Sequence, residues 1–159
     1  MVNDPNICDH TSVGVIVFKN QKILLIERNI PPYGFAPPAG HVDSHGTFKN
    51  AAKGELKEEV GLKTTSLELV GKGLKLNKCS RKKGNYHFWK IYKAKVEDYN
   101  LNIAKREVKQ AKWFSKKKIR LFMKRTQKYL KGDISDKEWQ ENPGLEIIWY
   151  KWFKELNII

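Results

Sequence analysis

The feature that most constrains this chain is a glutamate triplet, Glu55, Glu58 and Glu59, in a segment with helical patterning. Because an α-helix turns by about 100° per residue, side chains three and four positions apart lie on one face. The three carboxylates therefore point the same way, and their mutual repulsion calls for a cation. Clustered carboxylate oxygens suit Mg²⁺ or Mn²⁺. The alternative interpretation is a solvated helix face.

The residues around the triplet predict a loop followed by a helix. The loop begins at Gly40, and the helical run extends from Thr47 to Val60. Thr47 is suited to cap the helix N-terminus, and Gly61 is suited to end the helix. An apolar stripe would dock the helix on a sheet and leave the glutamates at the edge of a cleft. The stripe consists of Ala52, Leu56 and Val60.

The segment from Gly40 to Leu62 resembles the signature of the Nudix hydrolase family. That signature is Gly, five residues, Glu, seven residues and then Arg-Glu-U-x-Glu-Glu-x-Gly-U, with U an aliphatic residue. The spacing fits without a gap, and the matching positions are Gly40, Glu55, Leu56, Glu58, Glu59, Gly61 and Leu62. Two positions differ, because Gly46 replaces the first Glu and Gly54 replaces the Arg.

Both differences bear on chemistry, because a carboxylate that activates a metal or a water must be held by its neighbours. Gly46 removes one hydrogen-bonding carboxylate, which Asp43 or His45 could partly offset. Gly54 inside a helix costs about 1 kcal/mol relative to Ala. It indicates either a close approach of substrate or backbone, or a relaxed requirement for the arginine.

The resemblance implies a metal-dependent hydrolase that cleaves the pyrophosphate bond of a nucleoside diphosphate linked to another moiety. It implies that Glu55, Glu58 and Glu59 are the catalytic residues and metal ligands, with Mg²⁺ or Mn²⁺ as cofactor and the Gly40 carbonyl as a further ligand. The family often uses one more carboxylate outside the signature. Glu107 is the candidate here, and its alternative is an exposed loop acid.

Four residues outside the signature are candidates for substrate binding. Arg28 closes the second predicted strand just before a proline-rich loop that contains Phe35, and the other two lie in a basic segment. The full set is Arg28, Phe35, Lys72 and Arg81. His41 and His45 have a spacing that suggests zinc, but without cysteine partners we interpret them as loop residues.

The fold expected from the resemblance is an α/β/α sandwich with a mixed β-sheet. With 159 residues, 40% of them hydrophobic, the chain can bury a real core. Strands are predicted at 11–18, 22–28, 67–77, 85–96 and 111–115, and helices after residue 61 at 116–130, 135–140 and 146–156. We expect a core at 1–131 and a helical extension at 132–159 packed on the same domain.

The extension holds three of the five tryptophans. They either pack the tail against the sheet or stack on a base at the mouth of the site, and packing is the favoured interpretation. The tail is expected to influence which substrate fits.

A net charge of +14 is unevenly distributed, since residues 69–96 contain no Asp or Glu. The positive electrostatic field of such a surface attracts nucleotides, polyphosphates or RNA. The alternative interpretation is that these lysines only solvate the surface. Two rival functions follow: a catalytically impaired Nudix-like module that binds a nucleotide or RNA, and an RNA 5′-end processing enzyme. Retention of all three glutamates argues against the first.

The sequence also predicts a cytoplasmic protein. Cys8 and Cys79 are too few for a disulfide framework, and the polar first residues lack the apolar core of a signal peptide. No stretch is long and apolar enough to span a membrane, so we expect no membrane partner. Nothing in the pattern specifies an oligomeric state.

Overall fold

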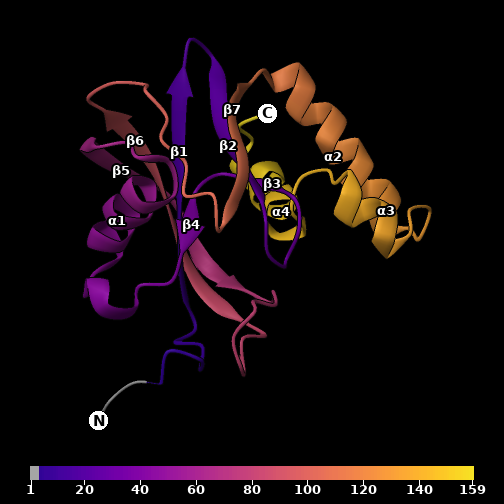
Figure 1. Cartoon of the computed structure of the whole chain (residues 1–159), viewed down its shortest axis with the longest axis horizontal. Helices are drawn as coiled ribbons and strands as arrows, with labels where there is room; N and C mark the ends of the chain where they lie inside the picture. The colour runs from indigo at the N-terminus through magenta and orange to yellow at the C-terminus, as the bar shows by residue number, and fades with distance from the viewer. Residues whose placement is uncertain (1–3) are drawn as a thin grey trace.

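The computed structural model describes residues 4–159, which form a mixed seven-stranded sheet between helices (Figure 1). In chain order the strands are β1 (Thr11–Lys19), β2 (Lys22–Arg28), β3 (Phe35–Ala36), β4 (Ala39–Gly40), β5 (Thr64–Lys75), β6 (His87–Val96) and β7 (Val108–Phe114). The helices are α1 (Phe48–Val60), α2 (Lys116–Leu130), α3 (Asp136–Glu141) and α4 (Ile147–Leu156), with a short 3₁₀ turn, η1, at Asp43–His45.

The sheet has the strand order β3-β2-β1-β6-β5, with β4 paired to β1 and β7 paired to β2. The β1–β6 pair is parallel, and the other pairs are antiparallel. Strands β1 and β2 are joined by Asn20 and Gln21, whose φ angles of 48° and 68° are both positive. Two-residue turns of this kind match the twist of an antiparallel hairpin.

Side chains of β1 alternate between two cores because successive residues of a strand point to opposite faces. Val13, Val15 and Val17 join the core beneath α1, whereas Ile16 joins the core beneath α4. Figure 1 shows α1 on one side of the sheet and α2, α3 and α4 on the other. The α/β/α sandwich expected from the sequence is confirmed.

Helix α1 begins and ends where the local signals predict. The Thr47 hydroxyl accepts a hydrogen bond from the Asn50 N–H at 3.1 Å, and Gly61 adopts the left-handed conformation with φ of 75°. The apolar stripe of α1 is fully buried against the sheet. The glutamates lie along one flank of this stripe, and Glu59 is itself buried.

The C-terminal tail contributes a large part of one core. Trp149, Trp152 and Phe153 of α4 are almost completely buried, and Trp149 meets Trp89 edge to face at a ring separation of 5.6 Å. The tail also pairs with β3, because the Phe35 N–H donates to the Gly144 carbonyl at 2.9 Å and the Glu146 N–H donates to the Phe35 carbonyl at 2.8 Å. Trp149 and Trp152 therefore pack the tail against the sheet. Within residues 4–159, none of the helices is both long and apolar enough to cross a membrane.

Candidate active site

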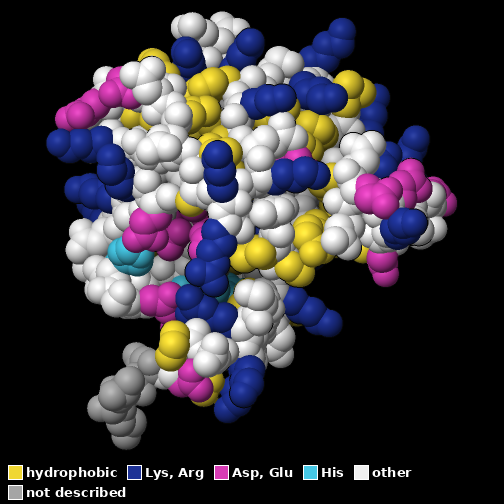
Figure 2. All heavy atoms as spheres, viewed as in Figure 1, with side chains coloured by type: hydrophobic (Ala, Val, Ile, Leu, Met, Phe, Trp, Pro, Cys, Tyr) yellow, Lys and Arg dark blue, Asp and Glu magenta, His cyan; other side chains and the backbone are white. Residues whose placement is uncertain are grey.

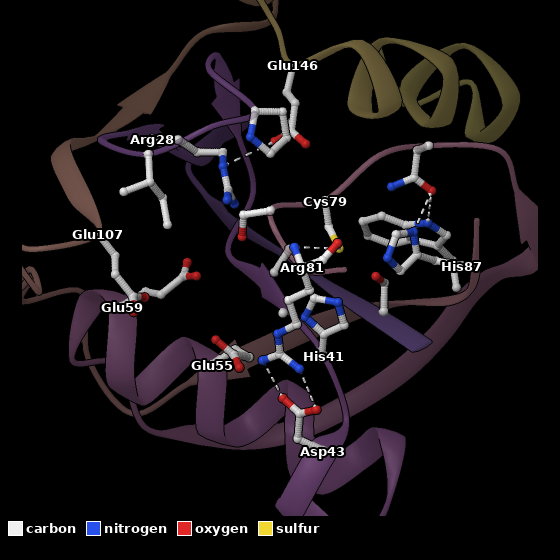
Figure 3. Close-up of a pocket in the computed structure, with 18 of the residues that line it drawn as sticks. Arg28, His41, Asp43, Glu55, Glu59, Cys79, Arg81, His87, Glu107 and Glu146 are labelled. Carbon is white, nitrogen blue, oxygen red and sulfur yellow. Dashed lines mark hydrogen bonds and ion pairs between the residues drawn. The ribbon is translucent and has the colours of Figure 1, made fainter. Parts of the chain in front are cut away.

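A cavity of about 460 Å³ opens beside the glutamate-bearing edge of α1. Its lining comes from β1, β2 and the loop after it, β4 and the loop after it, α1, the β5–β6 connection, β6, the loop before β7, and the tail including α4. Figure 3 shows Glu55 and Glu59 projecting from α1 into this cavity, with Glu107 beside them and Arg28 and Glu146 on the facing side. The triplet is thus part of a concave site.

Glu55 is held against the backbone of β4. A Cβ atom at Gly40 would overlap Cδ of Glu55 and lie 2.7 Å from its Oε2. Only glycine permits this approach, which gives the first signature glycine a steric role. Burial, followed by the charges of Glu58 and Glu107, raises the pKa of Glu55 to about 8.

Glu59 is the most buried member of the triplet, with 4% of its surface exposed. Its Oε2 has no hydrogen-bond partner among the described residues. Burial, followed by the charge of Glu55, raises the pKa of Glu59 well above its usual value, and Arg28 opposes that rise. An unpartnered buried carboxylate oxygen is costly, so this arrangement fits a bound cation with a preference for oxygen ligands.

Glu58 lies at the exposed rim of the same face. His45 connects it to Glu55, because its Nε2 is 3.7 Å from Glu55 Oε1 and 4.0 Å from Glu58 Oε1. The His45 ring itself lies against Gly54. A ligand atom from each of His45, Glu55 and Glu58 falls within 4.8 Å of the other two.

Arg28 faces a carboxylate that the sequence did not reveal. Its Nε lies 3.9 Å from Oε2 of Glu146, which comes from the tail. Burial raises the pKa of Glu146 to about 7, and Arg28 opposes the rise. The tail backbone reaches this position over Gly34, where a Cβ atom would lie 2.6 Å from the Glu146 nitrogen. No local pattern in the sequence signals this approach.

Arg81 forms an ion pair with a residue of the loop after β4. Its two terminal nitrogens each donate to one oxygen of Asp43 at 2.7 Å, forming a bidentate pair. This pair joins the β5–β6 connection to the loop beside Gly40. Arg81 lines the cavity, and its pairing with Asp43 makes it part of the cavity wall.

The structure brings most of the sequence-derived candidates together at this cavity. They are Gly40, Glu55, Glu58, Glu59, Glu107, Arg28 and Arg81. Phe35 and Lys72 do not line it. Phe35 is buried in the core, stacked on Phe122 with ring centroids 4.3 Å apart, and Lys72 is exposed on β5 opposite Lys90. Phe35 and Lys72 therefore lie apart from the other candidates for substrate binding.

A second cavity of about 530 Å³ adjoins the first. The two share four lining residues: Pro32, Asn77, Lys78 and Glu146. Its other walls are mainly apolar and include Tyr33, Ile148 and Trp139, whose indole stacks on Tyr129 with centroids 4.3 Å apart. An apolar recess beside a polar one suits a ligand with a flat organic group and a charged group.

Comparison with known proteins places most of the chain in one family. The family model described as NUDIX domain matches residues 9–133. No curated protein sequence shows a significant match.

Solved structures share the fold at low sequence identity. The MutT protein from Methanosarcina mazei Go1 superposes with a TM-score of 0.65 at 14% identity, covering 92% of this chain and 91% of that chain. The NUDIX domain of Shewanella oneidensis NrtR complexed with ADP ribose gives 0.55 at 19% identity, covering 70% and 77%. A C. elegans Ap4A hydrolase binary complex gives 0.56 at 22% identity, covering 72% and 83%.

Proposed function

This chain belongs to the Nudix family, and we propose on that premise that it hydrolyses the pyrophosphate bond of a nucleoside diphosphate linked to another moiety. The observation that carries the proposal is the buried carboxylate of Glu59, whose Oε2 has no hydrogen-bond partner within residues 4–159, beside Glu55 in an open cavity. Burial of two neighbouring carboxylates, one of them with an unpartnered oxygen, is costly, and such costs are typical of functional sites.

The carboxylates fit a divalent cation such as Mg²⁺ or Mn²⁺. Glu55 and Glu59 would hold it, with Glu58 at the rim and the Gly40 carbonyl as a further oxygen. When bound, such a cation polarises a phosphoryl oxygen and lowers the pKa of a water molecule. The affinity would come from hard oxygen ligands that the protein has already gathered and partly desolvated.

Arg28 is assigned to bind and orient the pyrophosphate. Its Nε is buried without a hydrogen-bond partner among the described residues, and the nearest carboxylate oxygen, on Glu146, is 3.9 Å away. A phosphate oxygen entering the cavity would supply the missing acceptor. Arg28 would also neutralise charge that develops on the phosphoryl group during transfer.

Glu107 is assigned to accept the proton of the attacking water. It lies outside the signature and lines the cavity close enough to raise the pKa of Glu55 and Glu59. Its backbone is held on both sides, since the Asn29 N–H donates to the Glu107 carbonyl at 2.9 Å and the Glu107 N–H donates to the Ala104 carbonyl at 3.0 Å. These bonds fix the backbone of Glu107 beside the cavity, and its exposed carboxylate is in a position to accept a proton there.

The adjoining apolar cavity is assigned to the nucleoside. Its walls of Tyr33, Trp139 and Ile148 suit a flat base, and the shared residues Asn77 and Lys78 lie between base and phosphate. Neighbours of the same fold include a complex with ADP ribose and an Ap4A hydrolase, which supports a nucleotide derivative as the substrate class.

RNA 5′-end processing is the second candidate, favoured by the positive surface. Figure 2 shows Lys and Arg side chains spread over the visible face around a smaller group of acidic and histidine side chains. Binding of RNA through many lysines should weaken steeply with added salt, whereas a single nucleotide should respond much less. Measurement of affinity across a salt series separates the two substrates.

The deciding experiment is product release from a panel of nucleoside triphosphates, dinucleoside polyphosphates, nucleotide sugars, ADP-ribose, NAD and capped RNA, with Mg²⁺ or Mn²⁺. We expect turnover that requires the metal and falls at least ~100-fold in Glu59→Gln. Glu97→Gln is the matched control, because Glu97 is an exposed acid paired with Lys63 away from the cavity. Absence of turnover on every substrate, with nucleotide or RNA binding retained, would favour the binding module instead.

A further inference from the structure

Two cysteines and two histidines converge at one end of the acidic cavity. A ligand atom from each of Cys8, His41, Cys79 and His87 lies within 4.8 Å of the other three. Cys8 and His87 are buried, and the other two are half-buried. Figure 3 shows His41, Cys79 and His87 on the side of the cavity away from Glu59 and Glu107.

The spacing of these atoms agrees with tetrahedral coordination. Cys8 Sγ is 3.5 Å from Nε2 of His41 and 3.2 Å from Nε2 of His87. Zinc bonds of about 2.3 Å to sulfur and about 2.0 Å to nitrogen, at a tetrahedral angle, place sulfur and nitrogen about 3.5 Å apart. The two separations between Cys8 and the histidines are therefore close to those that one zinc ion requires, and the other ligand atoms lie within 4.8 Å of one another.

The orientation of His87 is set by a second layer of hydrogen bonds. Its Nδ1 lies 3.1 Å from Oδ1 of Asn77, and the Trp89 indole N–H donates to the same oxygen at 3.1 Å. An amide oxygen only accepts, so Nδ1 carries the proton and Nε2 presents its lone pair toward Cys8. Metal-binding histidines are typically held by such a partner on the other ring nitrogen.

Both sulfur atoms accept a hydrogen bond within a backbone turn. The His10 N–H donates to Cys8 Sγ at 3.2 Å, and the Arg81 N–H donates to Cys79 Sγ at 3.4 Å. Each donor is the residue two positions after the cysteine, and such bonds stabilise negative charge on sulfur. Gly84 leaves room for this turn, because a Cβ atom there would overlap Cys79 Sγ.

We propose that Cys8, His41, Cys79 and His87 form a structural Zn²⁺ site, separate from the carboxylate site. Two thiolates and two imidazoles select zinc over Mg²⁺, and four protein ligands complete its coordination. The ligands come from four separate places in the sequence, and Cys8 precedes the segment that matches the family model. The site goes beyond the proposed hydrolase function and does not depend on it.

The proposed zinc ion would link separate segments of the chain at the rim of the active-site cavity. Cys8 belongs to an N-terminal segment that pairs with the β5–β6 connection, through a hydrogen bond of 2.9 Å from the Cys8 N–H to the Lys82 carbonyl. His41 follows Gly40 directly, and Cys79 is two residues before Arg81, the partner of Asp43. Zinc would thus join the N-terminal segment, the β5–β6 connection and the loop after β4, and its binding energy would stabilise the fold.

Metal content tests the site directly. The full chain is purified under reducing conditions after expression with added zinc, and its metals are measured by mass spectrometry. We expect about one zinc per chain in the wild type and in the matched control Glu59→Gln, and none in Cys8→Ser or Cys79→Ser. Absence of zinc from the wild type, or its retention in both Cys8→Ser and Cys79→Ser, would overturn the proposal.

A second measurement uses the wild type alone, so that a misfolded variant cannot obscure the result. A zinc chelator should lower the thermal unfolding midpoint, and added Zn²⁺ but not Mg²⁺ should restore it. X-ray absorption at the zinc edge should give both sulfur and nitrogen ligands. An unchanged midpoint, a zinc shell of oxygen atoms, or a Cys8–Cys79 disulfide in the reduced preparation would contradict the assignment.

Discussion

The imidazole of His45 lies over Gly54, where a Cβ atom would overlap Cε1 of the ring and lie 2.8 Å from Nδ1. From this position the ring reaches Glu55 and Glu58. The close approach at Gly54 is therefore made by a side chain of the preceding loop, and neither sequence-based explanation of this glycine anticipated it. Gly46, the other departure from the signature, ends the short turn that carries His45, with φ of 83°.

The contact predicts an energetic coupling between positions 45 and 54. In a His45→Ala background, Gly54→Ala should stabilise the protein by about 1 kcal/mol, because alanine favours the helix. In the wild-type background the gain should be smaller or reversed, because the new methyl group displaces the ring. Denaturant unfolding of the four proteins in a double-mutant cycle measures the difference. Equal gains in both backgrounds would show that the ring does not occupy this place in solution.

Gly40→Ala should impair catalysis more than folding. The added methyl group overlaps the Glu55 carboxyl group, so that carboxylate must leave its position at the cavity. We expect kcat to fall by ~100-fold with a change in unfolding free energy of about 1 to 3 kcal/mol. Steady-state kinetics and urea unfolding provide the two values. Unchanged kcat in a folded variant would remove Glu55 from its assigned role.

Arg28 and Lys72 make a matched pair of cationic substitutions. Arg28→Ala should raise KM and lower kcat/KM by ~100-fold, because a guanidinium that faces the substrate phosphates is lost. Lys72→Ala should leave both constants within twofold, because Lys72 is exposed on β5 outside the cavity. Kinetics on the best substrate of the panel test both. A comparable loss in Lys72→Ala would place the phosphates elsewhere.

Glu146 predicts how stability depends on pH. Burial raises its pKa in the folded protein to about 7 from a usual value of 4.5, so the folded state holds a proton that the unfolded state releases. The stability contributed by this group therefore falls as pH rises from about 4.5 to about 7 and is constant above. Glu146→Gln should remove the part of the decline that Glu146 causes, so the stability of the variant relative to wild type should grow by about 3 kcal/mol over that interval. Urea unfolding at several pH values measures it, and a difference independent of pH would contradict the raised pKa.

The sequence alone determined the helices and strands with strong local signals. Helix α1 matches its prediction because its cap at Thr47 and its terminator at Gly61 act within one turn of the chain. Helix α2 and strand β2 match residue for residue, since both have a clear apolar pattern. The glutamate face was equally readable, because a spacing of three and four residues translates into direction wherever a helix forms.

Tertiary structure alone decided which distant residues meet. Glu146 reaches Arg28 because the tail pairs with β3, and the Cys8–His87 contact exists because the N-terminal segment pairs with the β5–β6 connection. The same long-range packing buried Phe35 in the core. A local pattern shows which face of its own helix or strand a residue occupies. Contacts between residues tens of positions apart depend on how the helices and strands pack. A single sequence carries no periodic signal for that packing.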